Sequence, residues 1–186
     1  AAPLELNLTH FNENNILAPV NLNRSGTVRA YLGVDIGSTS TKYALIDEEG
    51  NIIHKCYLPT RGKPIEVAQE LLRTLKKEYG STLQLIAVAT TGSGRNVVGD
   101  FLDADLVIDE ITAHARGAVA VDPEVDTIFE IGGQDSKYIR IDNTHPLDFD
   151  MNKVCAAGTG SFLHELANKM KINIVGEFQN VALSSR

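Results

Sequence analysis

The 186-residue chain has few of the residues that define special protein classes. It has only two cysteines, Cys56 and Cys155, so it lacks a disulfide framework, and a reducing compartment such as the cytoplasm is expected. It has no apolar run near the roughly 18 residues of a membrane span, and no signal-peptide pattern opens it. With a net charge of -7 and no Lys/Arg block, it offers no face to a nucleic-acid backbone.

What is present is the composition of a soluble globular protein, with 43% hydrophobic and 22% charged residues. The length suits one ordinary domain. The first residue is not Met and the opening stretch is rich in Asn. We therefore interpret residues 1–28 as a linker or tail of a larger protein and expect the folded part to begin at residue 29.

Residues 30–121 carry the periodicity of a βββαβαβα unit. An apolar run, an alternating stretch and a third such stretch predict three strands joined by short turns, over 30–36, 41–47 and 51–59. Strands over 83–92 and 104–109 alternate with helices over 63–80, 94–102 and 109–121. The first helix is predicted to bury one apolar face: Ile65, Val67, Ala68, Leu71, Leu72 and Leu75.

The pattern begins again at residue 125. Three strands are predicted over 125–134, 135–142 and 146–153, then a helix over 159–171 and a further helix. This is an internal repeat whose second copy is incomplete. The predicted fold class is α/β, of the ribonuclease-H-like type, with two halves at 29–123 and 124–186 that face each other across a nucleotide cleft.

Each half opens with a strand that runs into a glycine turn, "VDIGSTSTK" at 34–42 and "FEIGGQDSK" at 129–137. Either turn alone is typical of a simple hairpin. One in each repeat, each with an acidic residue two positions before a glycine and a lysine further on, indicates a phosphate site. Backbone N–H groups, hydroxyls and a Lys charge would hold phosphates, and Asp35 and Asp135 would hold Mg²⁺ through its waters.

Five motifs then carry a family resemblance: "GVDIGSTSTKYALID", "TTGSGR", "DEITAHARGA", "EIGGQDSKYI" and "MNKVCAAGTGSFLHELA". Together they resemble the activases of 2-hydroxyacyl-CoA dehydratases and benzoyl-CoA reductases, in the actin, Hsp70 and sugar kinase superfamily. The resemblance implies a homodimer that hydrolyses ATP and drives a low-potential electron into a dehydratase or reductase partner.

The resemblance also implies the site residues. Asp35 and Asp135 would be catalytic and would hold Mg²⁺. The nucleotide would be bound by two phosphate turns and by the residues that open the following helix: Gly37, Ser38, Thr39, Lys42, Gly132, Gly133, Gln134, Gly158, Thr159 and Gly160.

The chain departs from the family at its cluster ligands. The family's [4Fe–4S] cluster takes two cysteines from each subunit, of which one is Cys155 and the other is replaced by Ala113. A methyl group cannot ligate iron, so a dimer offers two thiolates where four are needed. Cys155 is expected near a helix start, where a thiolate is favoured. Cys56 is expected to pack in the core, and His114 either to pack or to replace the missing ligand.

Three further positions are noted. Glu130 stands where the family usually has Asp, one methylene longer. The sequence leaves two interpretations of the stretch "TTGSGR" (90–95): it contacts the nucleotide, or it is a plain strand-to-helix turn. Asp109 and Glu110 precede a helix and are interpreted as capping residues.

We expect an ATPase module of the activase family, in which nucleotide-driven motion of the halves promotes electron transfer to its partner. Two alternatives remain open from the sequence. A small-molecule kinase of the same superfamily would need a sugar pocket and a catalytic carboxylate. A non-catalytic module that kept the fold would lack ATP binding altogether.

Overall fold

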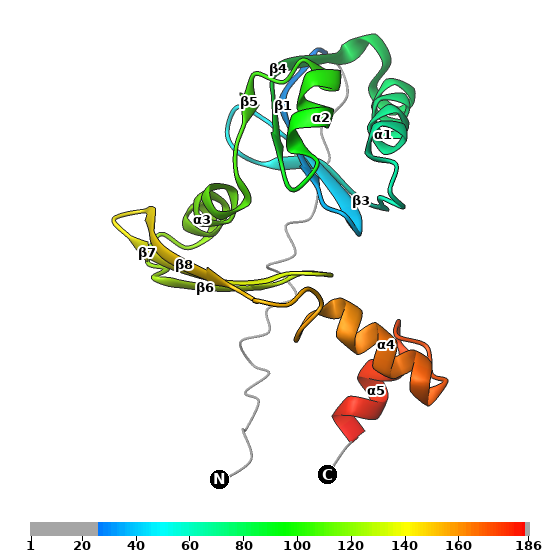
Figure 1. The fold of residues 1–186 in the computed structure, drawn as a ribbon. Coiled ribbons are helices and arrows are strands. Elements are labelled where there is room, and N and C mark those ends of the chain that lie inside the picture. The colour runs from blue at the N-terminus through cyan, green and yellow to red at the C-terminus, as the bar shows by residue number, and fades with distance from the viewer. Residues whose placement is uncertain (1–25, 185–186) are drawn as a thin grey trace.

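The apolar run predicted as the first strand forms β1, the middle strand of the first sheet. The computed structural model describes residues 26–184, so most of the predicted tail lies outside it (Figure 1). The sheet has the order β3-β2-β1-β4-β5, in which β1, β2 and β3 are antiparallel neighbours and β4 and β5 run parallel to β1. Its strands are β1 (Val28–Ile36), β2 (Ser40–Ile46), β3 (Ile52–Pro59), β4 (Leu83–Thr91) and β5 (Leu106–Val107).

Two helices, α1 (Pro64–Tyr79) and α2 (Arg95–Leu102), cover one face of this sheet. Leu71 is fully buried against alternate residues of β1, as the periodicity predicts. Leu72 is 38% exposed, so its predicted place in the core is wrong, and Tyr79 at the helix end is buried instead. A short 3-10 turn, Gly80–Thr82, then leads into β4.

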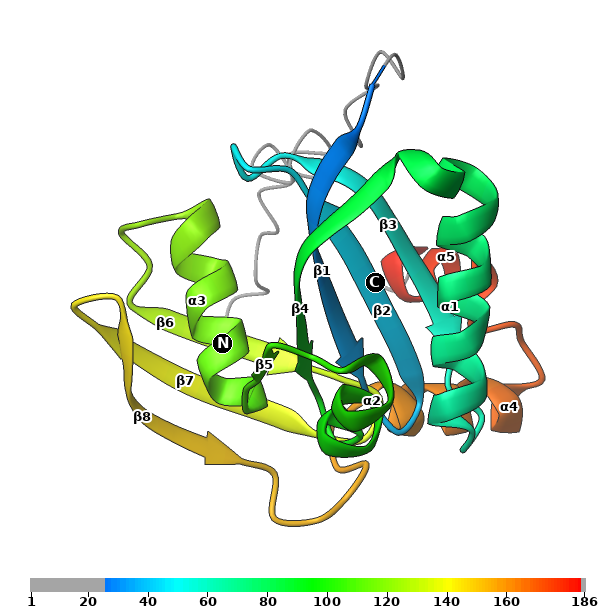
Figure 2. The same cartoon turned by 90° about the horizontal axis from the view of Figure 1, so that it is seen from above.

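The second sheet is an antiparallel meander of β6 (Thr127–Ile131), β7 (Ser136–Asp142) and β8 (His145–Met151). Helix α3 (Glu110–Val121) follows the first sheet in the chain but packs on the second, because its buried Ala115 lies against Ile139 and Ile141. Figure 2 shows α3 over β6–β8 and away from α1. The predicted boundary between 123 and 124 stays a prediction.

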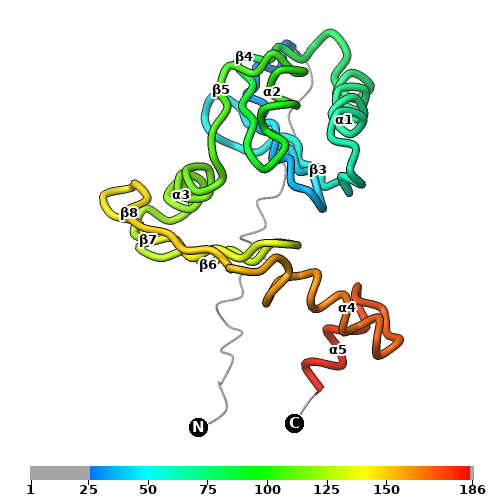
Figure 3. Tube along the Cα trace, viewed as in Figure 1, coloured from blue at the N-terminus to red at the C-terminus, as the bar shows by residue number. Residues whose placement is uncertain are grey.

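The described chain ends in two helices, α4 (Gly160–Met170) and α5 (Glu177–Ser184). Figure 3 follows it from β5 into α3, through the second sheet, and on to α4 and α5. The predicted order βββαβαβα, then βββα and a further helix, is confirmed. Across residues 26–184, no helix is both long enough and apolar enough to cross a membrane.

Candidate nucleotide site

The first glycine turn closes tightly between β1 and β2. The N–H of Gly37 donates to the carbonyl of Ser40 at 2.9 Å, and the buried hydroxyl of Thr60 donates to the carbonyl of Gly37 at 2.7 Å. A side chain at Gly37 would bring its Cβ to 2.9 Å from the Ser40 carbonyl oxygen, so the turn requires glycine. Across the strand pair, Lys42 Nζ lies 3.1 Å from Asp35 Oδ2. Both side chains are partly exposed, so this ion pair adds little stability.

Within the stretch 90–95, residues 92–94 form the turn from β4 to α2, and this turn lies at the end of β1. The N–H of Gly94 donates to the carbonyl of Ile36 at 2.9 Å, and the guanidinium of Arg95 donates to the carbonyl of Gly92 at 3.0 Å. The turn thus buttresses the strand that carries Asp35. Ser93 lines the cavity described below, so the turn supplies a wall of the candidate site.

The second glycine turn is held from the start of α4. The N–H groups of Gly160 and Ser161 each donate at 2.9 Å to the carbonyls of Gly132 and Gly133. Fully buried Thr159 donates its hydroxyl to the carbonyl of Gly133 at 2.9 Å. These first amides of α4 are therefore used to fix the turn. Of the predicted segment Gly158–Gly160, Thr159 and Gly160 therefore position the second turn in this structure.

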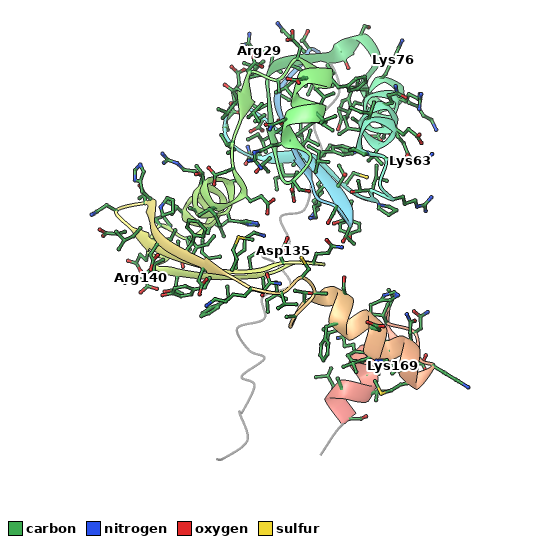
Figure 4. All side chains as sticks on the ribbon, viewed as in Figure 1. Arg29, Lys63, Lys76, Asp135, Arg140 and Lys169 are labelled. Atoms are coloured by element: carbon green, nitrogen blue, oxygen red, sulfur yellow. The ribbon has the colours of Figure 1, made fainter. Side chains whose placement is uncertain are left out.

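The two turns meet. The Ser38 hydroxyl donates to Gln134 Oε1 at 3.3 Å, and a Cβ added to Gly133 would lie 2.9 Å from Thr39 Oγ1. Beside this contact lies a polar cavity of about 230 Å³. Figure 4 labels Asp135 at the end of the second sheet nearest the first. The predicted residues that line the cavity are Asp35, Gly37, Ser38, Thr39, Lys42, Gly132, Gly133, Gln134 and Asp135.

The cavity also contains an ion-pair cluster that the sequence analysis missed. Lys137 Nζ lies 2.8 Å from Glu130 Oε2 and 2.9 Å from Glu110 Oε2, and its side chain is 6% exposed. Burial works to lower the pKa of Lys137, but the hydrogen bonds and charges of Glu130 and Glu110 outweigh it and raise that pKa. The amine therefore stays charged at neutral pH, and its contribution to stability is lost only as the pH rises through the raised pKa.

The two acidic residues before α3 have different roles. Asp109 is the N-cap, because the Thr112 N–H donates to its carboxylate at 2.9 Å, and this bond lowers the pKa of Asp109. The cap is thus at full strength above the usual Asp range and is lost as the pH falls through the lowered pKa. Capping is confirmed for Asp109, whereas Glu110 reaches Lys137 across the cavity. Its place next to a capping residue concealed that role in the sequence.

A larger cavity of about 1050 Å³ opens from the same turns. It shares Asp35, Lys42 and Gly133 with the smaller cavity and continues along α4. Three polar side chains of α4, those of His164, Glu165 and Asn168, line its far wall. The smaller cavity suits a phosphate chain, and the larger one leaves room for the rest of a nucleotide.

A further cavity of about 720 Å³ lies over the face of the first sheet that α1 and α2 do not cover. Small side chains of three adjacent strands form its floor, at Gly33, Ala44 and Ala89. Ala113 and Arg116 of α3 line it as well. Charged residues line it too, but neither glycine turn does, so we take the space between the turns as the candidate site.

The residues present do not fit a [4Fe–4S] cluster. Within 26–184, no group of three or more His, Cys, Asp or Glu side chains is arranged to hold a metal ion. Cys155 is exposed in the turn that directly precedes α4, near the start of that helix. Cys56 packs against the core of the first half, as predicted. His114 lines both the smaller and the larger cavity beside the turns.

The sheet order and the paired glycine turns define a class, the actin-like ATPases with a ribonuclease-H-like fold. Within this class, the chain belongs to the BadF/BadG/BcrA/BcrD ATPase family, whose profile matches residues 32–176. The resemblance drawn from the five motifs is therefore confirmed.

Individual relatives agree. The activating ATPase of (R)-2-hydroxyglutaryl-CoA dehydratase from Acidaminococcus fermentans is 33% identical, over 77% of this chain and 54% of its own length. The 2-hydroxyisocaproyl-CoA dehydratase activator of Clostridioides difficile is 35% identical, over 83% and 57%. The chain thus spans about half the length of these curated relatives.

Solved structures agree on the fold. The activator of 2-hydroxyisocaproyl-CoA dehydratase with bound ADPNP superimposes with a TM-score of 0.69 at 32% identity, covering 84% of this chain and 57% of its own. Component A of (R)-2-hydroxyglutaryl-CoA dehydratase gives a TM-score of 0.68 at 33% identity, covering 77% and 55%. The ethanolamine utilization protein EutJ from Carboxydothermus hydrogenoformans, at 20% identity and a TM-score of 0.57, shares the fold alone.

Proposed function

We propose that this chain is the Mg-ATP-binding module of a dehydratase or reductase activase, in which ATP hydrolysis moves the two halves relative to each other. The observation that carries the proposal is the cavity between the two glycine turns, one turn from each half, with Asp35, Lys42 and Asp135 on its walls. A relative of this chain holds the ATP analogue ADPNP.

The phosphate chain of ATP would lie in the smaller cavity, against the N–H groups of both turns and the Lys42 ammonium. Mg²⁺, when bound there, would neutralise phosphate charge, with Asp35 and Asp135 holding it through its waters. The carboxylates on the cavity walls suit this hard cation, which prefers oxygen ligands. The nucleoside would extend into the larger cavity along α4.

Hydrogen bonds connect the second glycine turn to the turn that carries Cys155. The N–H of Ala156 donates to the carbonyl of Gln134 at 2.8 Å, and the Asn152 amide donates to the same carbonyl at 3.2 Å. Because the two turns share these bonds, a shift of Gln134 on hydrolysis would move the turn that carries Cys155. We infer that this face meets the electron-transfer partner, a dehydratase or reductase as in the relatives, and that the working unit is a homodimer.

Nucleotide titration tests the proposal. The chain is expected to bind Mg-ATP and Mg-ADP, measured by calorimetry, and to bind ATP more weakly when Mg²⁺ is removed with EDTA. Asp35→Asn should weaken Mg-ATP binding at least tenfold, about 1.4 kcal/mol, since it removes a charge that faces the metal. The exposed Asp100→Asn on α2 is the matched control and should bind as the unaltered chain does. Absence of Mg-ATP binding by a folded chain refutes the proposal.

Iron reconstitution tests the cluster separately. Because Ala113 supplies no thiolate, anaerobic treatment with iron and sulfide is expected to leave the chain well short of about four irons per dimer and without the broad absorbance of a [4Fe–4S] cluster. Cys155→Ser, assayed alongside, should change the iron content little. A full cluster in the unaltered chain that Cys155→Ser abolishes would contradict this prediction, whatever the result for ATP.

A further inference from the structure

The face of the first sheet that α1 and α2 leave uncovered carries a row of small residues that no motif explains. Gly33 of β1 pairs with Ala44 of β2 on one side and with Ala89 of β4 on the other, so the three lie side by side across three strands. Glycine inside a strand often marks a place that a ligand or another backbone approaches closely. A Cβ added to Gly33 would meet nothing within 4 Å, so the described chain does not fill the space above this row.

This row of small residues is the floor of the cavity of about 720 Å³. Its volume lies in the usual range of small-molecule sites, which are largely apolar with a few placed polar groups. Helix α3 also lines the cavity, through Ala113 and Arg116. Figure 2 shows α1 and α3 on opposite sides of the first sheet. Because α3 packs on the second sheet, a molecule bound in this cavity would contact both halves of the chain.

The next row across the same strands supplies polar groups. Asp35 of β1 pairs with Lys42 of β2 and with Thr91 of β4. Thr91 lines the cavity, and in residues 26–184 its hydroxyl is the one buried side-chain polar group without a hydrogen-bond partner. Buried polar groups are nearly always paired. This hydroxyl therefore needs a partner that residues 26–184 do not supply.

Positive charge is in excess around the cavity. Among the described residues that line it, the cations are Lys42, Lys55 and Arg116, and the one anion is Asp35. Asp35 is already paired with Lys42, at 3.1 Å. The guanidinium of Arg116 has several N–H donors, of which the hydrogen bonds of the described residues use one, toward His145 Nε2 at 3.4 Å. Positive charge beside a flat floor of small side chains favours a ligand with a negative group on a flat apolar body.

We propose that this cavity binds an amphipathic organic anion, with its flat apolar body on the row of small residues and its carboxylate or sulfonate toward Arg116. The site is distinct from the proposed nucleotide site, although Asp35 and Lys42 line both cavities. Binding here is non-covalent and requires no nucleotide, so its test is independent of the proposed function.

Anilinonaphthalene sulfonate (ANS) is the test ligand, because it joins a flat apolar body to a sulfonate and becomes strongly fluorescent in apolar surroundings. One molecule of ANS is expected to bind per chain in fluorescence and calorimetric titrations. Gly33→Val should weaken ANS binding about tenfold or more, because its side chain would occupy the floor of the site. The variant should stay folded in urea titrations, since its Cβ meets no neighbour. Gln84→Val, at an exposed position of β4 outside the cavity, is the matched control and should bind ANS unchanged.

Arg116→Gln tests the place of the negative group. It should weaken ANS binding about tenfold, because a hydrogen bond to a charged group is lost. Phenylnaphthylamine, the same molecule without the sulfonate, should bind this variant within about twofold of the unaltered chain. Arg73→Gln, on the exposed surface of α1, is the matched control and should change neither affinity.

Three results would overturn the proposal. Unchanged ANS affinity in Gly33→Val would mean that ANS binds elsewhere, for example on the exposed side chains of Phe129 and Ile131. Equal losses of ANS and phenylnaphthylamine in Arg116→Gln would mean that the arginine does not contact the negative group. Absence of saturable ANS binding by the folded chain would mean that the cavity takes no such ligand, and the proposal for Mg-ATP would be unaffected.

Discussion

Replacing Gly92 with alanine is expected to lower the free energy of unfolding by about 2–6 kcal/mol. The residue has φ +89°, which strains an L side chain, and its Cβ would stand 2.4 Å from the Ile36 carbonyl oxygen and 2.6 Å from Asp35 Oδ1. Strain in that region costs about 1–3 kcal/mol, and forced overpacking about the same again. The contact is largely with backbone, so no rotamer change relieves it.

Gly50→Ala separates the two costs. Gly50 has nearly the same φ, +87°, but nothing lies within 4 Å of its added Cβ. It should lose only about 1–2 kcal/mol, the cost of the left-handed conformation. Urea unfolding of both variants measures the difference through the shift of the midpoint. Equal losses in the two would mean that the turn over β1 yields easily and does not buttress Asp35.

The local fold could be predicted because its signals are local. The alternation in β1–β3, the Pro64 and Gly80 that bracket α1, and the Asp109 cap each act within a few residues. The predicted burial of Leu72 was wrong because the predicted apolar face of α1 included one residue too many. Its neighbour Leu71 is fully buried while Leu72 turns toward solvent.

The packing of α3 could not be predicted from local signals. The helix is Ala-rich and shows little contrast between its faces, so its sequence does not say which sheet it covers. Contact with Ile139 and Ile141, more than 20 residues further along the chain, decides this. That same placement brings Glu110 to Lys137, and the cluster was therefore missed.

The glycine turns lie between these cases. The motif of an acidic residue, any residue and Gly, followed by Lys, occurs once per repeat. It was enough to predict that Asp35 and Asp135 would line one cavity. The role of Lys137, the lysine of the second motif, could not be predicted from the sequence. Lys42 is half exposed beside Asp35, whereas Lys137 is buried between two glutamates. The two similar motifs thus have different electrostatic surroundings, because α3 packs on the second sheet and brings Glu110 to Lys137.

The contact between the two glycine turns predicts a large effect on nucleotide binding. Gly133→Ala is expected to weaken Mg-ATP binding by up to about 100-fold, while the chain stays folded. The new Cβ would meet the Thr39 side chain at 2.9 Å from Oγ1 and 3.1 Å from Cβ, so the turns must move apart. Overpacking of this kind costs about 1–3 kcal/mol, and each 1.4 kcal/mol is tenfold in affinity.

Two variants make the experiment decisive. Gly117→Ala in α3 adds the same methyl group where nothing lies within 4 Å, and it should leave Mg-ATP binding unchanged. Thr39→Ala weakens binding by itself through the lost hydroxyl, but combined with Gly133→Ala it should cost less than the sum of the two, because the clash is partly removed. Strict additivity in calorimetric titrations would mean that the turns do not touch in the ATP-bound state. The spacing of the two halves would then be set by α3 and the Glu110–Lys137–Glu130 cluster instead.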